Sequence, residues 1–236
     1  RIDNRARDHW LRVRLPVGID APAARAASPF DAVLRPRRGT GQGDACQPAC
    51  GFLDVSAPGR GLAILSDGLY EYEFPNDPDG RVFLTLLRAT GHIHRDEADG
   101  NLGDDWLVPE NQCPGRHEFR FALLPHDGHQ PEGWAFGMAR EYLAPLQAFC
   151  QPVHPDRFAV SRPFVQEPGI HETFLLPGDR LHPDLPATAS LVSTDSPDMV
   201  LSCLKRAEDR DTFILRLFNG SGQPAAFRLR TGMPLA

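Results

Sequence analysis

The chain has 236 residues, of which 41% are hydrophobic and 24% are charged. This composition is ordinary for a soluble globular protein with a substantial core, so it argues against intrinsic disorder and against a membrane-spanning protein. The formal net charge is −6 and Lys205 is the only lysine. Because no excess of cations is available to neutralise phosphates, the charge also argues against a nucleic-acid partner.

Proline and glycine are frequent, with 23 and 21 copies spread along the whole chain. So many breakers leave room only for short elements. Short strands separated by frequent turns predict an all-β sandwich or barrel. The first residues include neither an initiator methionine nor an apolar leader, so we expect a fragment of a longer protein.

The N-terminal part predicts short strands joined by loops. At 10–15, Trp10, Arg12 and Arg14 alternate with three apolar residues, which predicts a half-buried strand. Apolar runs and turn residues predict the other elements of this part: a loop rich in Ala and Pro at 16–28, and strands at 30–34 and 51–56.

A long β-hairpin is predicted next. The apolar runs 61–74 and 82–88 are separated by the turn residues of 75–80. Glu71 and Glu73 would share one strand face, an arrangement more typical of a solvated edge than of a catalytic carboxylate pair.

The polar stretch from Gly91 to Asp105 is the best candidate for a functional loop, since long loops are usually functional or disordered. His92 and His94 flank Ile93 at its start, and both could project to one side. A metal site could begin in this way. We favour exposed histidines that contact a sugar or another domain.

The C-terminal half predicts one helix and several strands. At 134–143, apolar residues recur at helical spacing, and Pro145 should end the helix. The predicted strands of this half lie at 117–124 and 189–193 and in a three-stranded meander at 199–205, 212–218 and 226–230, with a positive-φ turn at Asn219-Gly220.

The five cysteines include no CxxC pair, and Cys46 and Cys50 have no second close pair that would complete a zinc site. We interpret the cysteines as buried free thiols in a cytoplasmic protein. The sequence also lacks a GxSxG nucleophile motif and a glycine-rich phosphate loop between a strand and a helix.

Five segments of the sequence, in order along the chain, resemble the corresponding segments of one enzyme family. They lie at 3–12, at 61–73, at 84–91, at 109–115, and at 200–209 with 215–219. Together they resemble the C-terminal β region of glycoside hydrolase family 38, the α-mannosidases. The chain departs from the family at Trp10, where an arginine-like residue often stands.

The resemblance implies a large antiparallel supersandwich, galactose mutarotase-like, over residues 1–236. It would pack behind an N-terminal catalytic barrel that this chain lacks. The resemblance implies that the whole enzyme hydrolyses an α-mannoside with retention, using a zinc ion and two carboxylates. These groups belong mainly to the barrel and have no matching positions here. We therefore expect no catalytic residue, metal ligand or cofactor in this chain, and no activity from it alone.

By its position after the strand at 82–88, the loop is implied to lend side chains to the rim of the substrate cleft. The rim residues would be Arg88, His92, His94, Arg95 and Asp96. The alternative for Arg88 is an ion pair with a core carboxylate, with the loop facing solvent.

The expected function is a non-catalytic domain that braces the barrel and completes the sugar cleft. Its partners would be its own catalytic domain and an α-mannoside, with no membrane and no nucleic acid. A homo-oligomer is also possible. Two other functions remain as alternatives: a stand-alone carbohydrate-binding module, and an enzyme that acts on sugars from a pocket in this fold.

Overall fold

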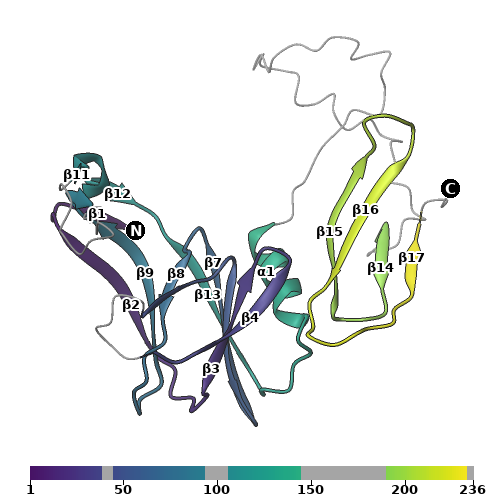
Figure 1. Cartoon of the computed structure of the whole chain (residues 1–236), viewed down its shortest axis with the longest axis horizontal. Coiled ribbons are helices and arrows are strands. Elements are labelled where there is room, and N and C mark those ends of the chain that lie inside the picture. Colours follow the sequence, from purple (N-terminus) through teal and green to yellow (C-terminus); the bar gives the residue numbers. More distant parts are fainter. Residues whose placement is uncertain (39–44, 94–105, 145–189, 233–236) are drawn as a thin grey trace, which may run out of the picture. The chain divides into compact units, whose positions relative to one another are not determined.

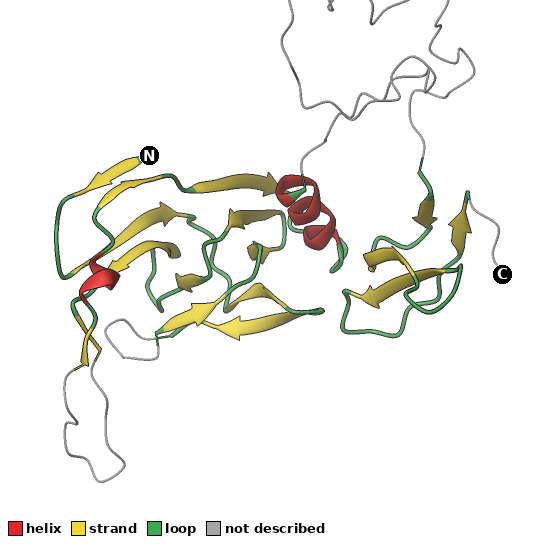
Figure 2. Cartoon of the chain, turned by 90° about the horizontal axis from the view of Figure 1, so that it is seen from above, coloured by secondary structure: helices red, strands yellow, loops and turns green. Residues whose placement is uncertain are grey.

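A computed structural model describes residues 1–38, 45–93, 106–144 and 190–232. These residues form short strands, one α-helix and one 3-10 helix (Figures 1 and 2). In chain order the elements are β1 (Ile2–Asn4), β2 (His9–Pro16), β3 (Ala23–Ser28), β4 (Asp31–Pro36), β5 (Cys46–Pro48), β6 (Phe52–Ala57), β7 (Arg60–Asp67), β8 (Glu71–Glu73), β9 (Arg81–Ala89), β10 (His92–Ile93), β11 (Trp106–Leu107), η1 (Pro109–Gln112), β12 (Gly115–His117), β13 (Arg120–His126), α1 (Trp134–Leu143), β14 (Val192–Thr194), β15 (Met199–Arg206), β16 (Phe213–Asn219) and β17 (Leu229–Thr231).

Two sheets form the body of the fold. The five-stranded sheet has the order β13-β7-β6-β3-β4 and the four-stranded sheet has the order β2-β9-β8-β5. Every ladder within these two sheets is antiparallel. The other described strands pair two by two, as β1-β12, β10-β11, β14-β17 and β15-β16. The predicted all-β antiparallel sandwich with one short α-helix is confirmed.

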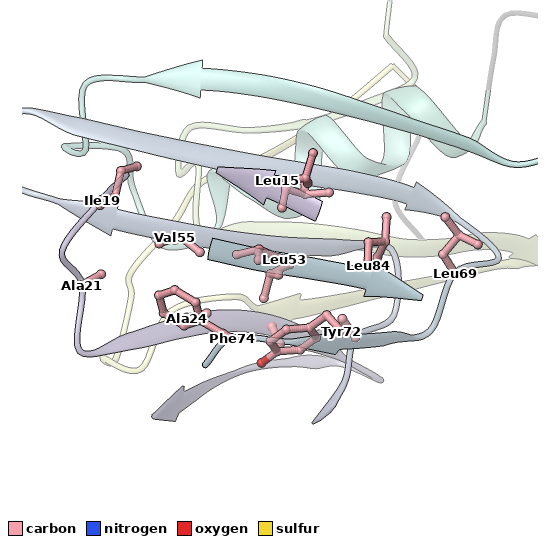
Figure 3. Close-up of a cluster of buried hydrophobic side chains, with 14 residues drawn as sticks. Leu15, Ile19, Ala21, Ala24, Leu53, Val55, Leu69, Tyr72, Phe74 and Leu84 are labelled. Carbon is pink, nitrogen blue, oxygen red and sulfur yellow. The ribbon is translucent and has the colours of Figure 1, made fainter. Parts of the chain in front are cut away.

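The main core draws its side chains from both sheets (Figure 3). Leu15 and Tyr72 belong to the four-stranded sheet, whereas Leu53 and Ile64 belong to the five-stranded sheet. Tyr72 is fully buried, and its hydroxyl donates to Oε1 of Gln47 over 3.3 Å. Burial raises the pKa of Tyr72 above its ordinary value, so the phenol stays neutral in the core.

A second apolar cluster joins the five-stranded sheet to helix α1. It includes Phe52 and Ala63 of the sheet, Phe136 and Ala139 of the helix, and Val200 of β15. The rings of Phe52 and Phe136 meet edge to face with centroids 4.9 Å apart. The amphipathic helix predicted at 134–143 is confirmed at its predicted bounds.

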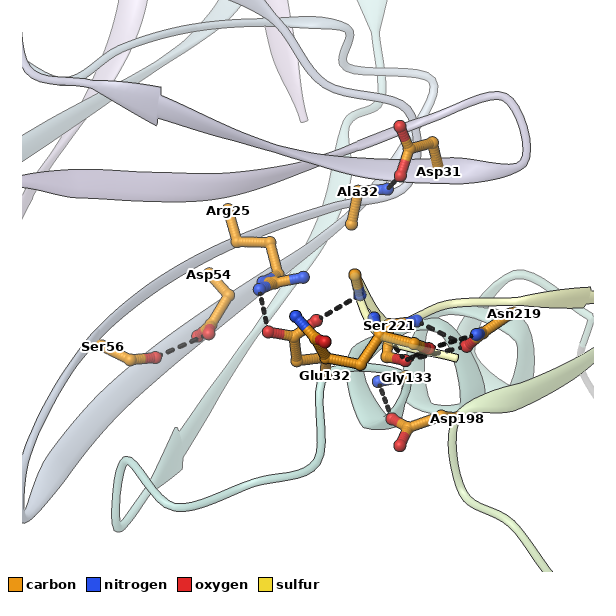
Figure 4. A network of polar contacts seen from close by, with 12 residues as sticks. Arg25, Asp31, Ala32, Asp54, Ser56, Glu132, Gly133, Asp198, Asn219 and Ser221 are labelled. Carbon is orange, nitrogen blue, oxygen red and sulfur yellow. Dashed lines mark hydrogen bonds and ion pairs between the residues drawn. The ribbon is translucent and has the colours of Figure 1, made fainter. Parts of the chain in front are cut away.

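Polar contacts at the start of α1 tie it to β3 and to the chain around β15 and β16 (Figure 4). The Glu132 carboxylate accepts from the main-chain N–H of Gly222 over 2.7 Å and forms an ion pair with Arg25 over 2.8 Å. Asp198 accepts from the N–H of Gly133 over 2.7 Å. The Gly222 hydrogen bond, with Arg25 beside it, holds the pKa of Glu132 below its usual value.

The segment 61–74 is two strands instead of one. β7 ends at Asp67, Gly68 adopts a positive φ of 75°, and β8 begins at Glu71. Because β7 pairs with β6 and β13 whereas β8 pairs with β9, the two strands belong to different sheets. The prediction of one long hairpin was therefore wrong for its first strand, although the turn at 75–80 does connect the paired strands β8 and β9.

The predicted loop at 16–28 was also wrong in its second half, because 23–28 form β3, an interior strand of the five-stranded sheet. Ala24 and Ala26 are completely buried. Alanine has little intrinsic preference for strands, so the pattern gave no strand signal. Its small side chain nevertheless suits a strand buried in the main core.

The predicted C-terminal meander is confirmed for its first two strands only. β15 pairs with β16 as predicted, but β17 pairs with β14. The turn after β16 contains no positive φ, contrary to the prediction for Asn219-Gly220. Instead, Oδ1 of Asn219 accepts from the N–H of Ser221 over 3.0 Å, so a side chain shapes the turn.

The chain divides into two compact units. One contains residues 1–144 with 194–229 and 236, and the other contains 145–193 with 230–235. Most of the second unit lies outside the described residues, and its described part includes most of the β14–β17 pair. The described portion of the chain contains no helix that is long and apolar enough to cross a membrane.

Candidate functional site

A β-bulge in β9 gathers polar side chains on the face of the four-stranded sheet that lies away from the main core. Successive residues of β2 pair with Leu87 and then with Thr85, which leaves Leu86 as the extra residue. In a regular strand, residues 85 and 88 would point to opposite faces. The bulge re-aims one of them, and both Thr85 and Arg88 reach the same carboxylate.

Glu71 of β8 is that carboxylate. Its Oε1 accepts from the hydroxyl of Thr85 over 2.7 Å and lies 3.1 Å from Nε of Arg88. The same threonine oxygen accepts from the indole N–H of Trp10 over 3.0 Å. Strands β2, β8 and β9 are therefore linked by a relay of polar contacts that ends on an arginine.

Two guanidinium groups lie against the Trp10 ring. The guanidinium carbon of Arg12 is 3.9 Å from the ring centre and that of Arg88 is 4.3 Å away, both within the range of cation–π attraction. Arg12 also forms an ion pair with Glu73, which is only 6% exposed. We call these side chains the Trp10 cluster: Trp10, Arg12, Glu71, Glu73, Thr85 and Arg88.

Cys46 of β5 borders the Trp10 cluster, with its Sγ 3.6 Å from a terminal nitrogen of Arg88. Burial and the nearby negative charges of Glu71 and Glu73 raise the pKa of the Cys46 thiol. The thiol therefore stays protonated and is a poor nucleophile at neutral pH.

The cysteines themselves depart from the prediction of buried free thiols. Cys46, Cys113 and Cys203 are free but half-buried, and Cys50 is free and exposed. Cys150 lies outside the described residues.

A second polar arrangement fixes the base of the candidate loop. Oδ1 of Asp8 accepts from the Gly91 N–H over 2.8 Å and from the side-chain amide of Gln112 over 2.7 Å. The Asp8 N–H donates in turn to Gln112 over 2.8 Å. The hydrogen bonds from Gln112 and Gly91 hold the pKa of Asp8 below its usual value. The chain thus leaves β9 in a defined direction.

The structure describes two of the five predicted rim residues. Arg88 lies at the end of β9 with 53% of its side chain exposed, and His92 is exposed in β10, which pairs with β11. His94, Arg95 and Asp96 lie outside the described residues. The ion pair that we considered for Arg88 is present, but its partner Glu71 is a half-exposed carboxylate of the outer face instead of a core group.

Sequence reasoning missed two features of this site. Glu71 and Glu73 do not form a solvated edge, because Glu73 is buried and each carboxylate pairs with an arginine. Trp10 was recognised as a strand residue and as a departure from the family, but not as part of a polar site. Two patterns in the sequence could have indicated the cluster. Trp10 and Arg12 lie two residues apart in one predicted strand, and Arg88 is the last residue of another predicted strand.

The chemistry of the Trp10 cluster favours binding over catalysis. Both of its carboxylates are paired with arginines, so neither is a free general acid or base. Among the described residues, no group of three or more His, Cys, Asp and Glu side chains could hold a metal ion. The described residues therefore offer no ligand set for the zinc that the resemblance places in the barrel.

Comparison with known proteins gives three relatives in sequence. The chain is 30% identical over 225 residues to the "Putative mannosylglycerate hydrolase" of Halalkalibacterium halodurans, covering 92% of the chain and 20% of that protein. It is 26% and 25% identical to the alpha-mannosidase 2C1 proteins of Mus musculus and Homo sapiens, covering 96% of the chain and 18% of each relative. No protein-family model matches the chain.

Two solved structures share the fold. A glycosyl hydrolase family 38 protein and an alpha-mannosidase, both from Enterococcus faecalis, match 97% of the chain with TM-scores of 0.70 and 0.71 at 23% identity. The chain covers 23% and 22% of those two chains. The chain therefore spans about a fifth of the length of the proteins that it matches.

Proposed function

We propose that this chain, which is homologous to part of the family-38 glycoside hydrolases, is the non-catalytic C-terminal β region of a longer α-mannoside hydrolase. In that protein it braces the catalytic barrel and completes the sugar cleft. The parent enzyme cleaves the α-mannoside with retention of configuration, and its zinc ion and reacting carboxylates come from the barrel.

One observation carries this proposal. Nearly the whole chain aligns with proteins named as mannosidases or as a mannosylglycerate hydrolase, yet it covers only about a fifth of each. The Trp10 cluster agrees with an accessory role, since both of its carboxylates are held by arginines. An unpaired carboxylate, which acid–base chemistry needs, is not present in it.

The rim of the cleft is the part that we assign to this chain. Arg88 lies at the end of β9 and His92 in β10, and Asp8 fixes Gly91 between the two strands. His94, Arg95 and Asp96 follow in the sequence and lie outside the described residues. A reducing, cytoplasmic location belongs to the proposal, because the described cysteines are free thiols.

The upstream reading frame tests this proposal directly. A frame that continues N-terminally from Arg1 into a zinc-bearing barrel is the expected result. A start codon close to Arg1 would overturn the assignment, because the chain would then have no catalytic segment to brace.

A stand-alone carbohydrate-binding module is the second candidate. The observation in its favour is Trp10, an indole that is 39% exposed on a sheet face and that lies beside two arginines. Calorimetric titration of the chain with mannose and mannobiose separates the two functions. A saturable heat of binding would favour the module, whereas the accessory role predicts none.

A further inference from the structure

We propose that three positioning residues set the orientation of the Arg88 side chain at the rim of the sugar cleft. They are Trp10, Glu71 and Thr85, and each acts through the arginine instead of contacting the sugar. The inference rests on the proposed function, because that function assigns Arg88 to the rim. It concerns how the arginine is held, whichever sugar the cleft takes.

The guanidinium of Arg88 is restrained by two different kinds of contact. Its Nε lies 3.1 Å from Oε1 of Glu71, and its central carbon lies 4.3 Å from the centre of the Trp10 ring. The ion pair restrains one edge of the planar group, and the ring restrains where the group lies. A half-exposed arginine without such contacts samples many rotamers, and ordering it on ligand binding costs conformational entropy.

Thr85 fixes the two side chains that hold the arginine. Its hydroxyl donates to Oε1 of Glu71 over 2.7 Å and accepts from the Trp10 indole N–H over 3.0 Å. A hydroxyl can donate one hydrogen bond and accept others, so this threonine satisfies both partners at once. Loss of the hydroxyl would therefore release the carboxylate and the ring together.

The β-bulge in β9 supports the same arrangement through the backbone. Leu86 is the extra residue of the bulge, and without it Thr85 and Arg88 would point to opposite faces of the sheet. Bulges re-aim side chains and are frequent next to active sites. The backbone irregularity and the polar contacts thus orient the same arginine.

The surroundings of Arg88 leave its orientation to Glu71 and Trp10. Glu73 is ion-paired with Arg12, and the Cys46 thiol makes only a weak contact of 3.6 Å with a terminal nitrogen of Arg88. Burial and the neighbouring carboxylates raise the pKa of that thiol, so it does not compete as an anion. Because 53% of the Arg88 side chain is exposed, the group is held at Nε and stays accessible.

The first measurement is the mobility of Arg88 in the 236-residue chain, from ¹⁵N relaxation of its Nε–H group by NMR. Loss of one signal in Arg88→Ala gives the assignment. We expect an ordered group in the original chain and picosecond-to-nanosecond mobility in Glu71→Gln, whose amide carries no charge, and in Trp10→Leu, which lacks the ring.

Thr85 is tested by a pair of variants. Thr85→Val removes the hydroxyl and should mobilise Arg88, whereas Thr85→Ser keeps the hydroxyl and should restore its order. Asp67→Asn is the matched control, since it breaks another partly exposed ion pair, with Arg120 in the other sheet. This control should leave Arg88 ordered.

The second measurement is the turnover of an aryl α-mannoside by the product of the complete reading frame. Glu71→Gln and Thr85→Val should raise KM by about fivefold or more with kcat unchanged, as expected when a contact common to bound substrate and transition state is lost. Asp67→Asn should change neither constant. Thr85→Val combined with Arg88→Ala should be no worse than Arg88→Ala alone, because Thr85 acts only through the arginine.

The inference is overturned by a mobile Arg88 in the original chain, by an ordered Arg88 in Glu71→Gln and Thr85→Val, or by additive losses in the double variant. Additive losses would mean that Thr85 only supports the fold. The reading-frame test stays separate. An ordered Arg88 in a chain whose gene starts at Arg1 would sink the proposed function alone, whereas a complete enzyme with a mobile Arg88 would sink this inference alone.

Discussion

Arg88 lies with its guanidinium carbon 4.3 Å from the centre of the Trp10 ring, on the strand position directly opposite it. Trp10 donates to Thr85, Arg88 pairs with Glu71, and Thr85 donates to Glu71. The four residues therefore form one connected unit across three strands. The bulge at Leu86 makes this possible, because it lets Thr85 and Arg88 act on the same face. The site therefore depends on backbone geometry as much as on residue type.

Replacement of Thr85 by valine should disconnect this unit. The change removes the donor to Glu71 and the acceptor of the Trp10 indole, so we expect a loss of about 1–2 kcal/mol in the free energy of unfolding. Urea unfolding measures it. Thr212→Val is the control, since no described contact involves the Thr212 hydroxyl, and an equal loss in both variants would contradict the role of Thr85 as the link.

Two glycine substitutions should change stability in opposite directions. A Cβ at Gly61 would lie 2.1 Å from the imidazole of His126, which is bonded to Asp54, so Gly61→Ala should destabilise the chain. A Cβ at Gly137 meets nothing within 4 Å. Gly137→Ala should therefore stabilise helix α1 by about 0.5–1 kcal/mol. Thermal unfolding of the pair gives the comparison, and a Gly61→Ala variant as stable as the original would be inconsistent with the β7–β13 packing.

The second apolar cluster depends on Phe52. This side chain is 0% exposed and meets Phe136 edge to face, so Phe52→Ala should cost about 3–5 kcal/mol. Phe213 is 62% exposed, and Phe213→Ala should change the stability by less than about 0.5 kcal/mol. Chemical denaturation of both variants measures the difference. Similar losses would mean that α1 does not pack on the sheet through Phe52.

Glu132 should make stability depend on pH. Its pKa is depressed in the folded state, so its contribution is fully present above its ordinary pKa of 4.5 and is lost as the pH falls through the lower folded value. Because 42% of the side chain is exposed, the contribution should be only about 0.5 kcal/mol. The stability difference between the original chain and Glu132→Gln should be largest above about pH 5 and should shrink toward about pH 3.

Glu141→Gln provides the matched control for that series, since Glu141 is an exposed residue of α1 with no described ion pair. Its difference from the original chain should stay flat over the same range. A flat difference for Glu132→Gln as well would contradict the hydrogen bond from Gly222.

Local patterns in the sequence were sufficient where neighbours along the chain decide the structure. Helix α1 could be predicted because its apolar spacing and the following Pro145 are local signals. Strand β3 could not, since its alanines become strand residues only when other strands bury them. The division of 61–74 at Gly68 could not be predicted for the same reason, because the pairing partners of β7 and β8 lie in different sheets.

The candidate site shows the same limit. Arg88 could be selected from its position at the end of a strand, as could the histidine that follows it. Its connection to Trp10 runs through Thr85, which is 75 residues from Trp10 in the sequence. The connection also requires the bulge in β9, which no sequence pattern predicted. Contacts of such separation follow from the register between strands, which only the folded chain defines.

The most direct test of the central claim is a turnover assay with an aryl α-mannoside, with and without zinc, on the purified chain and on the product of the complete reading frame. The account predicts no turnover by the chain alone under either condition and zinc-dependent turnover by the complete product. Turnover by the chain alone would contradict the assignment of this β region as a non-catalytic part of an α-mannoside hydrolase.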